Sequence, residues 1–261
     1  MTAELLSPRA LGRTSRRAPW TLMYHSVNGS DGSRDDDDPY LVTVTPARLA
    51  RQLAWLRDHG LRGVSMRELL AARAAGRRSH RVGLTFDDGY ADFRTHALPL
   101  LLEHGHTATV FVLPGRLGGT NVWDTRGPRK TLLDADGIRE VAAAGMEIGS
   151  HGLLHRDLTT VHEVTLAAEV RGSRRRLADL TGTAPEGFCY PYGAIDVRAL
   201  LAVRDAGYGY ACAVDPGPLA GRYALPRTYV GEDDTGPRLH AKRWLHRVRR
   251  ARLTALPEQD E

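Results

Sequence analysis

Two neighbouring carboxylates are the most distinctive chemical feature of this sequence. Asp87 and Asp88 lie in the segment TFDDG at residues 85–89, where an apolar run ends at a glycine. One carboxylate at such a place can bind a metal ion, while its neighbour accepts a proton from a water molecule that the ion activates. A solvated acidic turn would explain the pentapeptide equally well when it is taken alone.

Two histidines spaced four residues apart favour the metal interpretation. His151 and His155 lie in the segment SHGLLH at residues 150–155. If this segment is a turn that enters a helix, both imidazoles can converge on one ion. Combined with the carboxylate pair, they describe a site of one Asp and two His that keeps open positions for water and substrate.

A repeated alternation of strands and helices must position these residues. Short β-branched or apolar runs predict seven strands, at residues 21–27, 62–66, 81–87, 107–113, 146–151, 187–191 and 208–214. Apolar spacing predicts helices around Leu49, Leu53 and Leu56, around Leu98, Leu101 and Leu102, and near residues 134–144, 162–180 and 196–206. We therefore expect an α/β fold, a distorted (β/α) barrel of about seven parallel strands in a single domain.

The candidate residues fall where such a barrel carries function, at the carboxyl ends of its strands. Asp87 and His151 each end a predicted strand, residues 190–193 end another, and His25 lies near the end of the first. The segments 28–39 and 115–131 are longer than usual strand-to-helix connections. We expect them to shape the rim of a pocket.

Charge divides the chain into a body and two basic ends. The net charge is +5, but residues 1–20 contribute +3 and residues 238–252 carry seven Lys or Arg and no acid, so residues 21–237 are slightly acidic. A body-wide surface for nucleic acid is therefore not expected. We expect a basic tail at residues 1–20, a catalytic barrel at 21–235, and a basic helix and tail at 236–261.

Three interpretations of the basic C-terminal helix remain open. It can be a solvated helix packed on the barrel, a surface for peripheral contact with an anionic membrane, or a site for a partner or polyanion. No apolar stretch predicts a signal peptide or a membrane span. The expected location is cytoplasmic, with contact at the inner membrane face as an option. Cys189 and Cys212 are expected to be buried free thiols.

The motifs TFDDG, SHxxxH and YPYG, in this order, resemble the polysaccharide deacetylase family, which is also called the NodB-homology domain or carbohydrate esterase family 4. The resemblance covers residues 21–230 and implies hydrolysis of the N-acetyl group of an amino sugar, with release of acetate. It implies that Asp87 is the general base, that Asp88, His151 and His155 hold one divalent metal ion, and that the third motif, with Pro191 and the backbone N–H of Tyr192, binds the oxyanion. Zinc suits these ligands, and cobalt and nickel are alternatives.

Two departures from the common family pattern concern the catalytic acid and base. The family's Arg two residues before the motif proline is replaced by Cys189, so the pKa of Asp87 must be set by another group. A late Leu-x-His motif is absent from residues 215–235. Residues 23–26, MYHS, resemble instead the permuted branch that includes the poly-N-acetylglucosamine deacetylases. We therefore expect His25 to be the general acid, the alternative being a histidine that only packs.

Substrate contacts are expected from the 115–131 loop. The Trp123 indole offers a flat face to a sugar ring, and Asp124 can accept hydrogen bonds from hydroxyl groups. A tryptophan that pins its own loop is the alternative. Two other functions stay open, namely a deacylase or amidase that acts on a non-sugar substrate and a barrel that binds carbohydrate without catalysis.

Overall fold

A parallel sheet forms the centre of the molecule, as the strand pattern predicts. The computed structural model describes residues 18–29, 38–77 and 80–249. The nine-stranded sheet has the order β10-β9-β8-β7-β6-β5-β1-β11, and β4 pairs with the first half of β5. Its strands are β1 (Thr21–Tyr24), β4 (Arg62–Val64), β5 (Arg81–Phe86), β6 (Thr109–Val112), β7 (Glu147–Ser150), β8 (Gly187–Cys189), β9 (Tyr210–Ala213), β10 (Leu225–Pro226) and β11 (Thr228–Tyr229). A separate two-stranded sheet joins β2 (Ser26–Val27) to β3 (Thr43–Val44).

The last two strands bring the sheet close to a closed barrel. β10 pairs with β9 at one edge, β11 pairs with β1 at the other, and Arg227 alone separates them. All seven predicted strands have a counterpart, although the first ends at Tyr24 and its residues Ser26–Val27 pair with β3 instead. The 225–229 segment was not predicted. A proline argues against a strand, because Pro226 lacks the backbone N–H that continuous strand pairing requires. Here the proline lies where the chain passes from one edge of the sheet to the other, so the short pairing on each side tolerates it.

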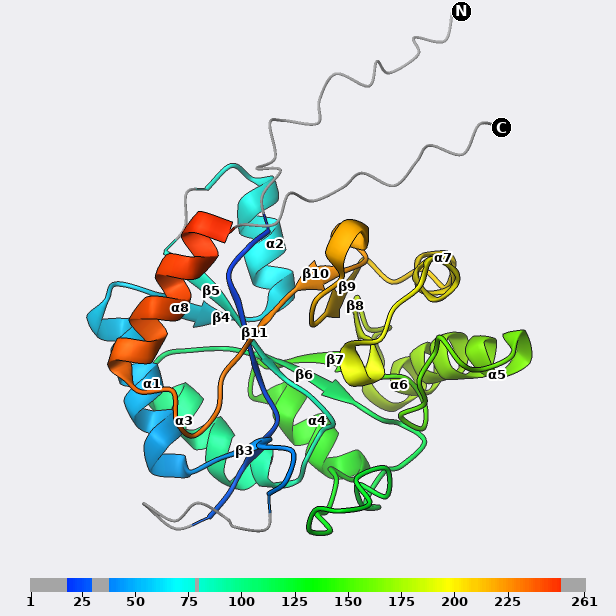
Figure 1. Cartoon of the computed structure of the whole chain (residues 1–261). Helices are drawn as coiled ribbons and strands as arrows, with labels where there is room; N and C mark the ends of the chain where they lie inside the picture. The colour runs from blue at the N-terminus through cyan, green and yellow to red at the C-terminus, as the bar shows by residue number, and fades with distance from the viewer. Residues whose placement is uncertain (1–17, 30–37, 78–79, 250–261) are drawn as a thin grey trace, which may run out of the picture.

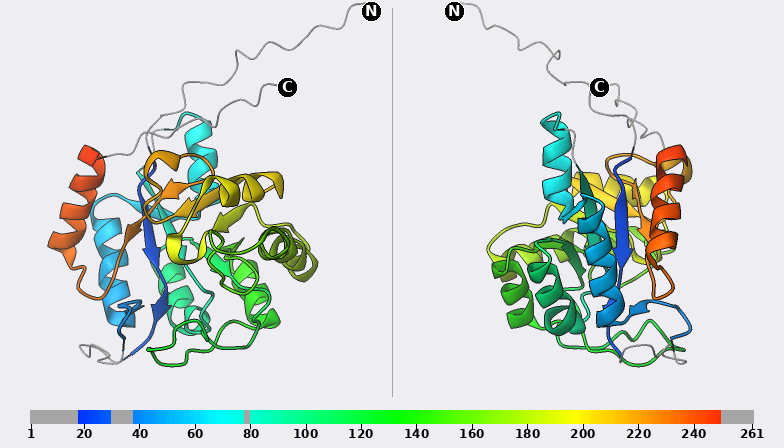
Figure 2. Two further views of the ribbon diagram at one scale, coloured as in Figure 1. Left: turned by 45° about the vertical axis from the view of Figure 1, so that its right-hand side comes forward. Right: turned by 90° about the vertical axis from the view of Figure 1, so that its left-hand side faces the viewer.

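Helices cover the outside of the barrel (Figures 1 and 2). They are α1 (Pro46–Asp58), α2 (Met66–Ala74), α3 (Leu98–Glu103), α4 (Ala135–Ala143), α5 (Glu163–Ala167), α6 (Ser173–Thr181), α7 (Val197–Asp205) and α8 (Gly236–Arg249). π-helical turns precede α3, at Phe93–Ala97, and join α5 to α6, at Ala168–Gly172. The predicted strand at 62–66 ends early, because the Ser65 hydroxyl accepts a hydrogen bond from the backbone N–H of Glu68 and so caps α2.

Alternation along the strands decides which side chains face the barrel interior. Phe86 belongs to the core beneath the outer helices and stacks on Tyr24 at a ring distance of 5.0 Å. The residues on either side of Phe86 must therefore point inward. The interior is filled by a smaller buried cluster that contains Phe111, Cys189 and Cys212, so both cysteines are buried and free, as expected.

The two predicted tails are described only in part. Of the predicted N-terminal tail, residues 1–17 lie outside the described residues, and so does the end of the C-terminal segment from residue 250. The same holds for residues 30–37 of the predicted rim loop. In the described part of the chain, no helix is long and apolar enough to cross a membrane.

Candidate active site

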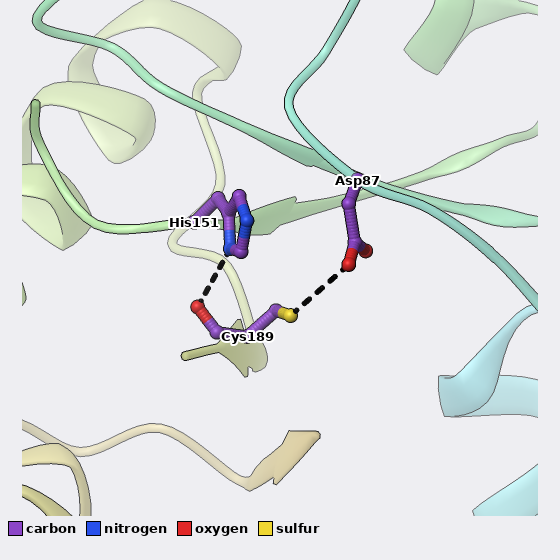
Figure 3. Close-up of side chains that lie close together, drawn as sticks. All are labelled: Asp87, His151 and Cys189. Carbon is purple, nitrogen blue, oxygen red and sulfur yellow. Dashed lines mark hydrogen bonds between the residues drawn. The ribbon is translucent and has the colours of Figure 1, made fainter. Parts of the chain in front are cut away.

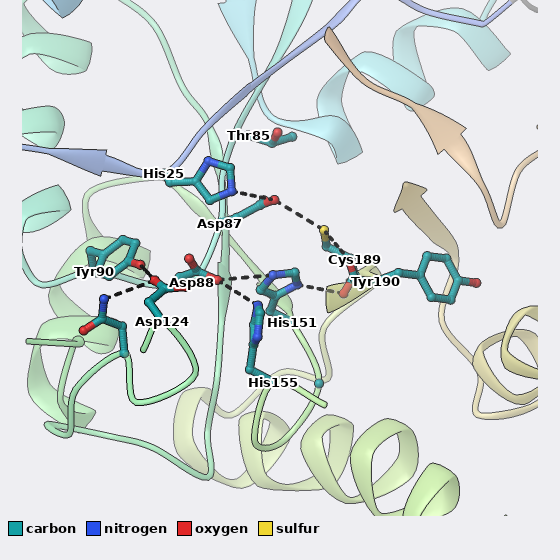
Figure 4. Close-up of polar contacts among 12 residues, drawn as sticks. His25, Thr85, Asp87, Asp88, Tyr90, Asp124, His151, His155, Cys189 and Tyr190 are labelled. Atoms are coloured by element: carbon teal, nitrogen blue, oxygen red, sulfur yellow. Dashed lines mark hydrogen bonds and ion pairs between the residues drawn. The ribbon is translucent and has the colours of Figure 1, made fainter. Parts of the chain in front are cut away.

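The carboxylate pair at the end of β5 is split between two sets of partners (Figure 4). Asp87 continues the strand, and its backbone N–H donates to the Tyr24 carbonyl at 2.9 Å. Asp88 then takes a left-handed conformation with φ 69°, which Asp tolerates better than most residues. Both side chains are buried, and the change of backbone direction sends the two carboxylates different ways.

Asp88 meets the two histidines of the second motif. Its Oδ1 lies 3.3 Å from Nε2 of His151 and 3.3 Å from Nε2 of His155. These three side chains offer ligand atoms that all lie within 4.8 Å of one another, and all three are buried. Burial alone would raise the pKa of Asp88, but the two imidazoles hold that pKa well below its usual value. The carboxylate is therefore ionised.

The turn that carries the histidines is held by a buried acid that the sequence did not reveal. Oε2 of Glu169, in the π-helical turn Ala168–Gly172, accepts the backbone N–H groups of Leu153 and Leu154 at 2.8 and 3.0 Å. Gly152 has φ 82°, and a Cβ there would lie 2.9 Å from the same Glu169 oxygen. Glycine is required at this position for both reasons. The turn is thus present and is held from an outer helix, but it does not enter a helix as predicted, because α5 begins only at Glu163.

The ring orientations of both histidines are fixed by their surroundings. Nδ1 of His151 lies 2.8 Å from the Cys189 carbonyl oxygen, which leaves Nε2 directed at Asp88. The His155 ring packs between Trp123, stacked at 4.4 Å, and Tyr192, edge-on at 4.5 Å. Burial lowers the pKa of His155, which favours the neutral imidazole that a metal ligand must be.

A second set of potential ligand atoms shares His151 and adds Asp87 and Cys189 (Figure 3). This set already has a cation. The Arg227 guanidinium donates to Asp87 at 2.6 and 2.7 Å and to the Cys189 sulfur at 3.0 Å. A metal ion there would have to displace a buried guanidinium from three contacts.

The Asp88 set is the better fit for a metal ion. Its Oδ1 is buried and has no hydrogen-bond partner of good geometry among the described residues, although it faces two imidazoles. Burial would lower the pKa of His151, yet the acidic groups Cys189, Asp88 and Asp87 raise it well above its usual value. An ion bound here would take the place of the proton on His151, because a ligating imidazole must be neutral.

Arg227 is the residue that replaces the missing motif arginine. It comes from the segment between β10 and β11, enters the barrel interior and also donates to the Thr85 hydroxyl at 3.1 Å. Burial alone would raise the pKa of Asp87, but the charge and hydrogen bonds of Arg227 outweigh burial and hold it below its usual value. No local motif marks Arg227 in the sequence. The available signal was an arginine directly after a proline in a segment with no other assignment.

His25 lies on the other side of Asp87 from the metal cluster (Figure 4). It follows β1, and its Nε2 is 3.9 Å from Oδ2 of Asp87. The ring is partly exposed, whereas its Nδ1 atom is buried and has no hydrogen-bond partner among the described residues. The structure thus brings His25 to the site, facing the candidate base. Its role as general acid stays a prediction.

The remaining predicted residues surround the cluster with different degrees of exposure. Pro191 is buried at the start of the turn Pro191–Gly193, and Tyr192 has φ 59° and a side chain that is 58% exposed. Trp123 stacks on His155, an arrangement that neither interpretation of this residue anticipated. Asp124 accepts hydrogen bonds from the Tyr90 hydroxyl at 3.2 Å and the Asn121 amide at 3.1 Å, so it also supports the loop.

A cavity of about 600 Å³ lies apart from this cluster, between α8, β3 and the residues that follow β11. None of the catalytic or metal-ligand candidates lines it. Its acids are engaged locally. Glu232, for example, accepts the backbone N–H of Thr45 at 2.7 Å and lies 3.5 Å from Arg48. The chemistry therefore belongs to the cluster around Asp87 and Asp88.

Comparison with known proteins finds relatives over most of the chain. YxkH of Bacillus subtilis (strain 168), which carries the name of a polysaccharide deacetylase, is 26% identical over 220 residues, or 82% of this chain and 72% of that protein. A poly-beta-1,6-N-acetyl-D-glucosamine N-deacetylase of Staphylococcus aureus (strain N315) is 22% identical over 204 residues, or 73% of this chain and 69% of that protein.

Solved structures share the fold. The deacetylase PplD of Streptococcus pyogenes, determined in complex with acetate, has a TM-score of 0.71 and 21% identity, covering 86% of this chain and 97% of that chain. A de-N-acetylase from Aggregatibacter actinomycetemcomitans has a TM-score of 0.72 and 20% identity, covering 85% and 98%. The family model described as polysaccharide deacetylase matches residues 74–211, which is more than half of the chain. The protein therefore belongs to the polysaccharide deacetylase family.

Proposed function

We propose that the protein hydrolyses the N-acetyl group of an amino sugar and releases acetate, with one divalent metal ion held by Asp88, His151 and His155. The observation that carries the proposal is the division of the carboxylate pair. Asp88 faces two imidazoles, while Asp87 is held by a guanidinium and faces His25. This arrangement separates a metal-binding carboxylate from a proton-accepting one.

The ligand set supports zinc, because mixed carboxylate and imidazole ligands suit it, with cobalt or nickel as alternatives. A divalent ion in this position would polarise the acetyl carbonyl and lower the pKa of a nearby water molecule. All other steps fall to side chains and backbone groups of this chain.

Asp87 accepts the proton of the attacking water. Its bidentate pairing with Arg227 keeps the carboxylate ionised and fixes both of its oxygens, so that the base does not rotate away from the substrate. Once water has added to the carbonyl, the carbon–nitrogen bond breaks only if the leaving nitrogen receives a proton. His25, 3.9 Å from Asp87, is the donor we assign, because imidazole exchanges protons near neutral pH.

The negative charge that develops on the carbonyl oxygen needs a hydrogen-bond donor. We assign the backbone N–H of Tyr192, in the turn that begins at Pro191, because this turn packs beside His155. A backbone donor costs no reorganisation during the reaction. The left-handed conformation of Tyr192 at φ 59° is the kind of local strain that often accompanies such a function.

The substrate class follows from the relatives rather than from a measured contact. The Staphylococcus aureus relative is named for poly-beta-1,6-N-acetyl-D-glucosamine, which supports an N-acetylglucosamine-containing substrate here. Acetate release should be measured on oligomers of N-acetylglucosamine with β-1,6 and β-1,4 links, on peptidoglycan fragments and on N-acetylated metabolites. Metal-loaded protein that releases no acetate from any of them would contradict the proposal and favour a non-sugar amide or a binding function.

The division of labour has its own test in two substitutions that differ by one position. Asp87→Asn should retain the metal and lose about 10²- to 10⁴-fold in turnover, because it removes the proton acceptor. Asp88→Asn should lose metal and activity together. Metal analysis of both purified variants, beside their rates of acetate release, decides the matter. If Asp87→Asn also lost its metal, the roles of the two carboxylates would have to be revised.

A further inference from the structure

Helix α8 turns an apolar side to the solvent. Its inner side is anchored to the barrel by Leu239, which is buried in the main core, and by Lys242, which donates to the Tyr229 carbonyl at 2.7 Å and to Asp234 at 2.6 Å. On the outer side, Trp244 is 59% exposed and Val248 is 62% exposed. A helix packed on a barrel ordinarily shows polar residues there.

The exposed residues form a continuous stripe. At 100° per residue, positions 237, 241, 244 and 248 lie on the side of the helix opposite Leu239, and Leu245, 37% exposed, lies next to them. We call Pro237, Ala241, Trp244, Leu245 and Val248 the outer stripe. Ala241 and Leu245 also line the cavity beside α8, so Pro237, Trp244 and Val248 are its outward-facing residues. Figures 1 and 2 show α8 on the outside of the barrel, with α1 on its inner side and none of the described helices over its outer side.

Basic residues flank the outer stripe on both sides. Arg247 borders it on one side and Arg238 on the other, and Arg243 and Lys242 lie on the same two flanks but closer to the barrel. Arg238 and Lys242 pair with Asp233 and Asp234, at 3.7 and 2.6 Å.

Arg243 and Arg247 have no ion pair within the described ranges. They are four residues apart, a spacing at which like charges repel on a helix. Burial and the charge of Arg247 lower the pKa of Arg243. Their surroundings therefore lack the negative charge that would stabilise them.

We infer that the outer stripe of α8 and its flanking arginines bind the surface of an anionic membrane, with Trp244 and Val248 in the interface and Arg243 and Arg247 against lipid phosphates. Helices that lie in a membrane surface combine an apolar side with basic flanks in this way. Tryptophan is favoured at the boundary between lipid and water.

The other occupants fit the charges and the stripe less well. A second copy of this chain would bring its own arginines against Arg243 and Arg247. A nucleic acid or a soluble polyanion would be held by the arginines and would leave Trp244 and Val248 without a role. The membrane assignment does not depend on the deacetylase assignment, because none of the site residues lies on α8.

Co-sedimentation of the full chain with vesicles tests the inference. The wild type should pellet with vesicles of phosphatidylglycerol and phosphatidylcholine, much less with phosphatidylcholine alone, and more weakly as salt is raised. Trp244→Ser combined with Val248→Ser should weaken partitioning by at least about tenfold, because two apolar side chains leave the interface. Arg243→Gln and Arg247→Gln should each weaken it by about fivefold.

Matched controls come from exposed residues of the same kinds elsewhere on the surface. Val164→Ser with Val197→Ser, and Arg175→Gln with Arg176→Gln, should pellet like the wild type. Unchanged circular dichroism and melting temperature establish that each variant is folded. Brominated lipid should quench tryptophan fluorescence in the wild type and far less in Trp244→Phe.

Two outcomes would overturn the inference. The first is equal pelleting with neutral and anionic vesicles, or none with either. The second is binding to anionic vesicles that the loss of Trp244 and Val248 leaves unchanged, together with equally strong binding to heparin. That result would identify a polyanion surface, or one that acts by charge alone.

Discussion

Asp87 shows how one residue's role depends on a partner far away in the chain. The carboxylate is buried, and a buried carboxylate without a partner would take up a proton and cease to be a base. Arg227, 140 residues later, prevents this through two short hydrogen bonds. Cys189 occupies the position of the family's motif arginine and contacts the same guanidinium at 3.0 Å. The positive charge beside Asp87 therefore comes from another position in the sequence than the one that the family pattern implies.

Moving the guanidinium from position 227 to position 189 tests whether Asp87 depends on this charge. Arg227→Met should lower kcat by about 10²-fold, because the base loses its orientation. It should also destabilise the fold by about 3 to 5 kcal/mol, because a buried carboxylate is left unpaired. Cys189→Arg added to Arg227→Met should restore part of both losses, because the new guanidinium starts from the position that the family commonly uses. Turnover, bound metal and melting temperature are measured for all three proteins.

The double substitution separates charge from local structure. Arg227→Lys serves as a second control, because it keeps a charge but loses the fork that contacts both oxygens of Asp87, and it should fall between the wild type and Arg227→Met. Loss of metal in Arg227→Met would show that the guanidinium supports the metal ligands as well, contrary to the separation of the two sets.

His25 is the second residue whose role can be measured separately. An amide nitrogen leaves only when protonated, whereas the phenolate of para-nitrophenyl acetate leaves without help. His25→Ala should therefore reduce kcat/KM on an N-acetylated sugar by about 10²- to 10⁴-fold and on the aryl ester by less than about tenfold. His80→Ala, at an exposed position, is the matched control and should change neither rate. Equal losses on both substrates would remove His25 from proton donation.

At the scale of elements, the turn after β7 is built by its neighbours as much as by its own residues. Two left-handed residues, Gly152 at φ 82° and His155 at φ 65°, bend the chain back. Glu169, in the π-helical turn Ala168–Gly172, then accepts the backbone N–H groups of Leu153 and Leu154 between them. The histidine spacing predicted the turn. The acid that fixes it lies within a segment that the apolar spacing predicts only as helix.

Removing that support should weaken the metal site without touching a ligand. Glu169→Ala leaves two part-buried backbone N–H groups without this acceptor, so we expect metal affinity to fall by about 10- to 100-fold. Glu169→Gln keeps one oxygen acceptor and should lose less. Glu140→Gln, on the exposed side of α4, should bind metal like the wild type. Competition with a chelator gives the three affinities, and unchanged affinity in Glu169→Ala would show that the turn holds itself.

At the scale of the whole molecule, the sequence predicts the repeating part of the barrel well and its closure poorly. Each of the seven predicted strands is a local apolar run, and the TFDDG and SHGLLH motifs lie at strand ends, as expected. The 225–229 segment has two short paired stretches around Arg227 and no run of apolar residues. Its conformation is decided by the two sheet edges it joins, which is a property of the finished barrel. The Arg227 partnership with Asp87 was hidden for the same reason.

Metal binding should stabilise the whole barrel, because its proposed ligands come from the ends of β5 and β7, with β6 between them. An ion that bridges these strands binds the folded chain far better than the unfolded one. At a free metal concentration of about 100 times the Kd, linkage gives about 2.7 kcal/mol, or a rise in melting temperature of about 5 to 10 °C. Melting curves with and without a chelator measure it. Asp87→Asn should keep the whole shift and His155→Ala should lose it, whereas a shift that survived His155→Ala would place the stabilising ion elsewhere.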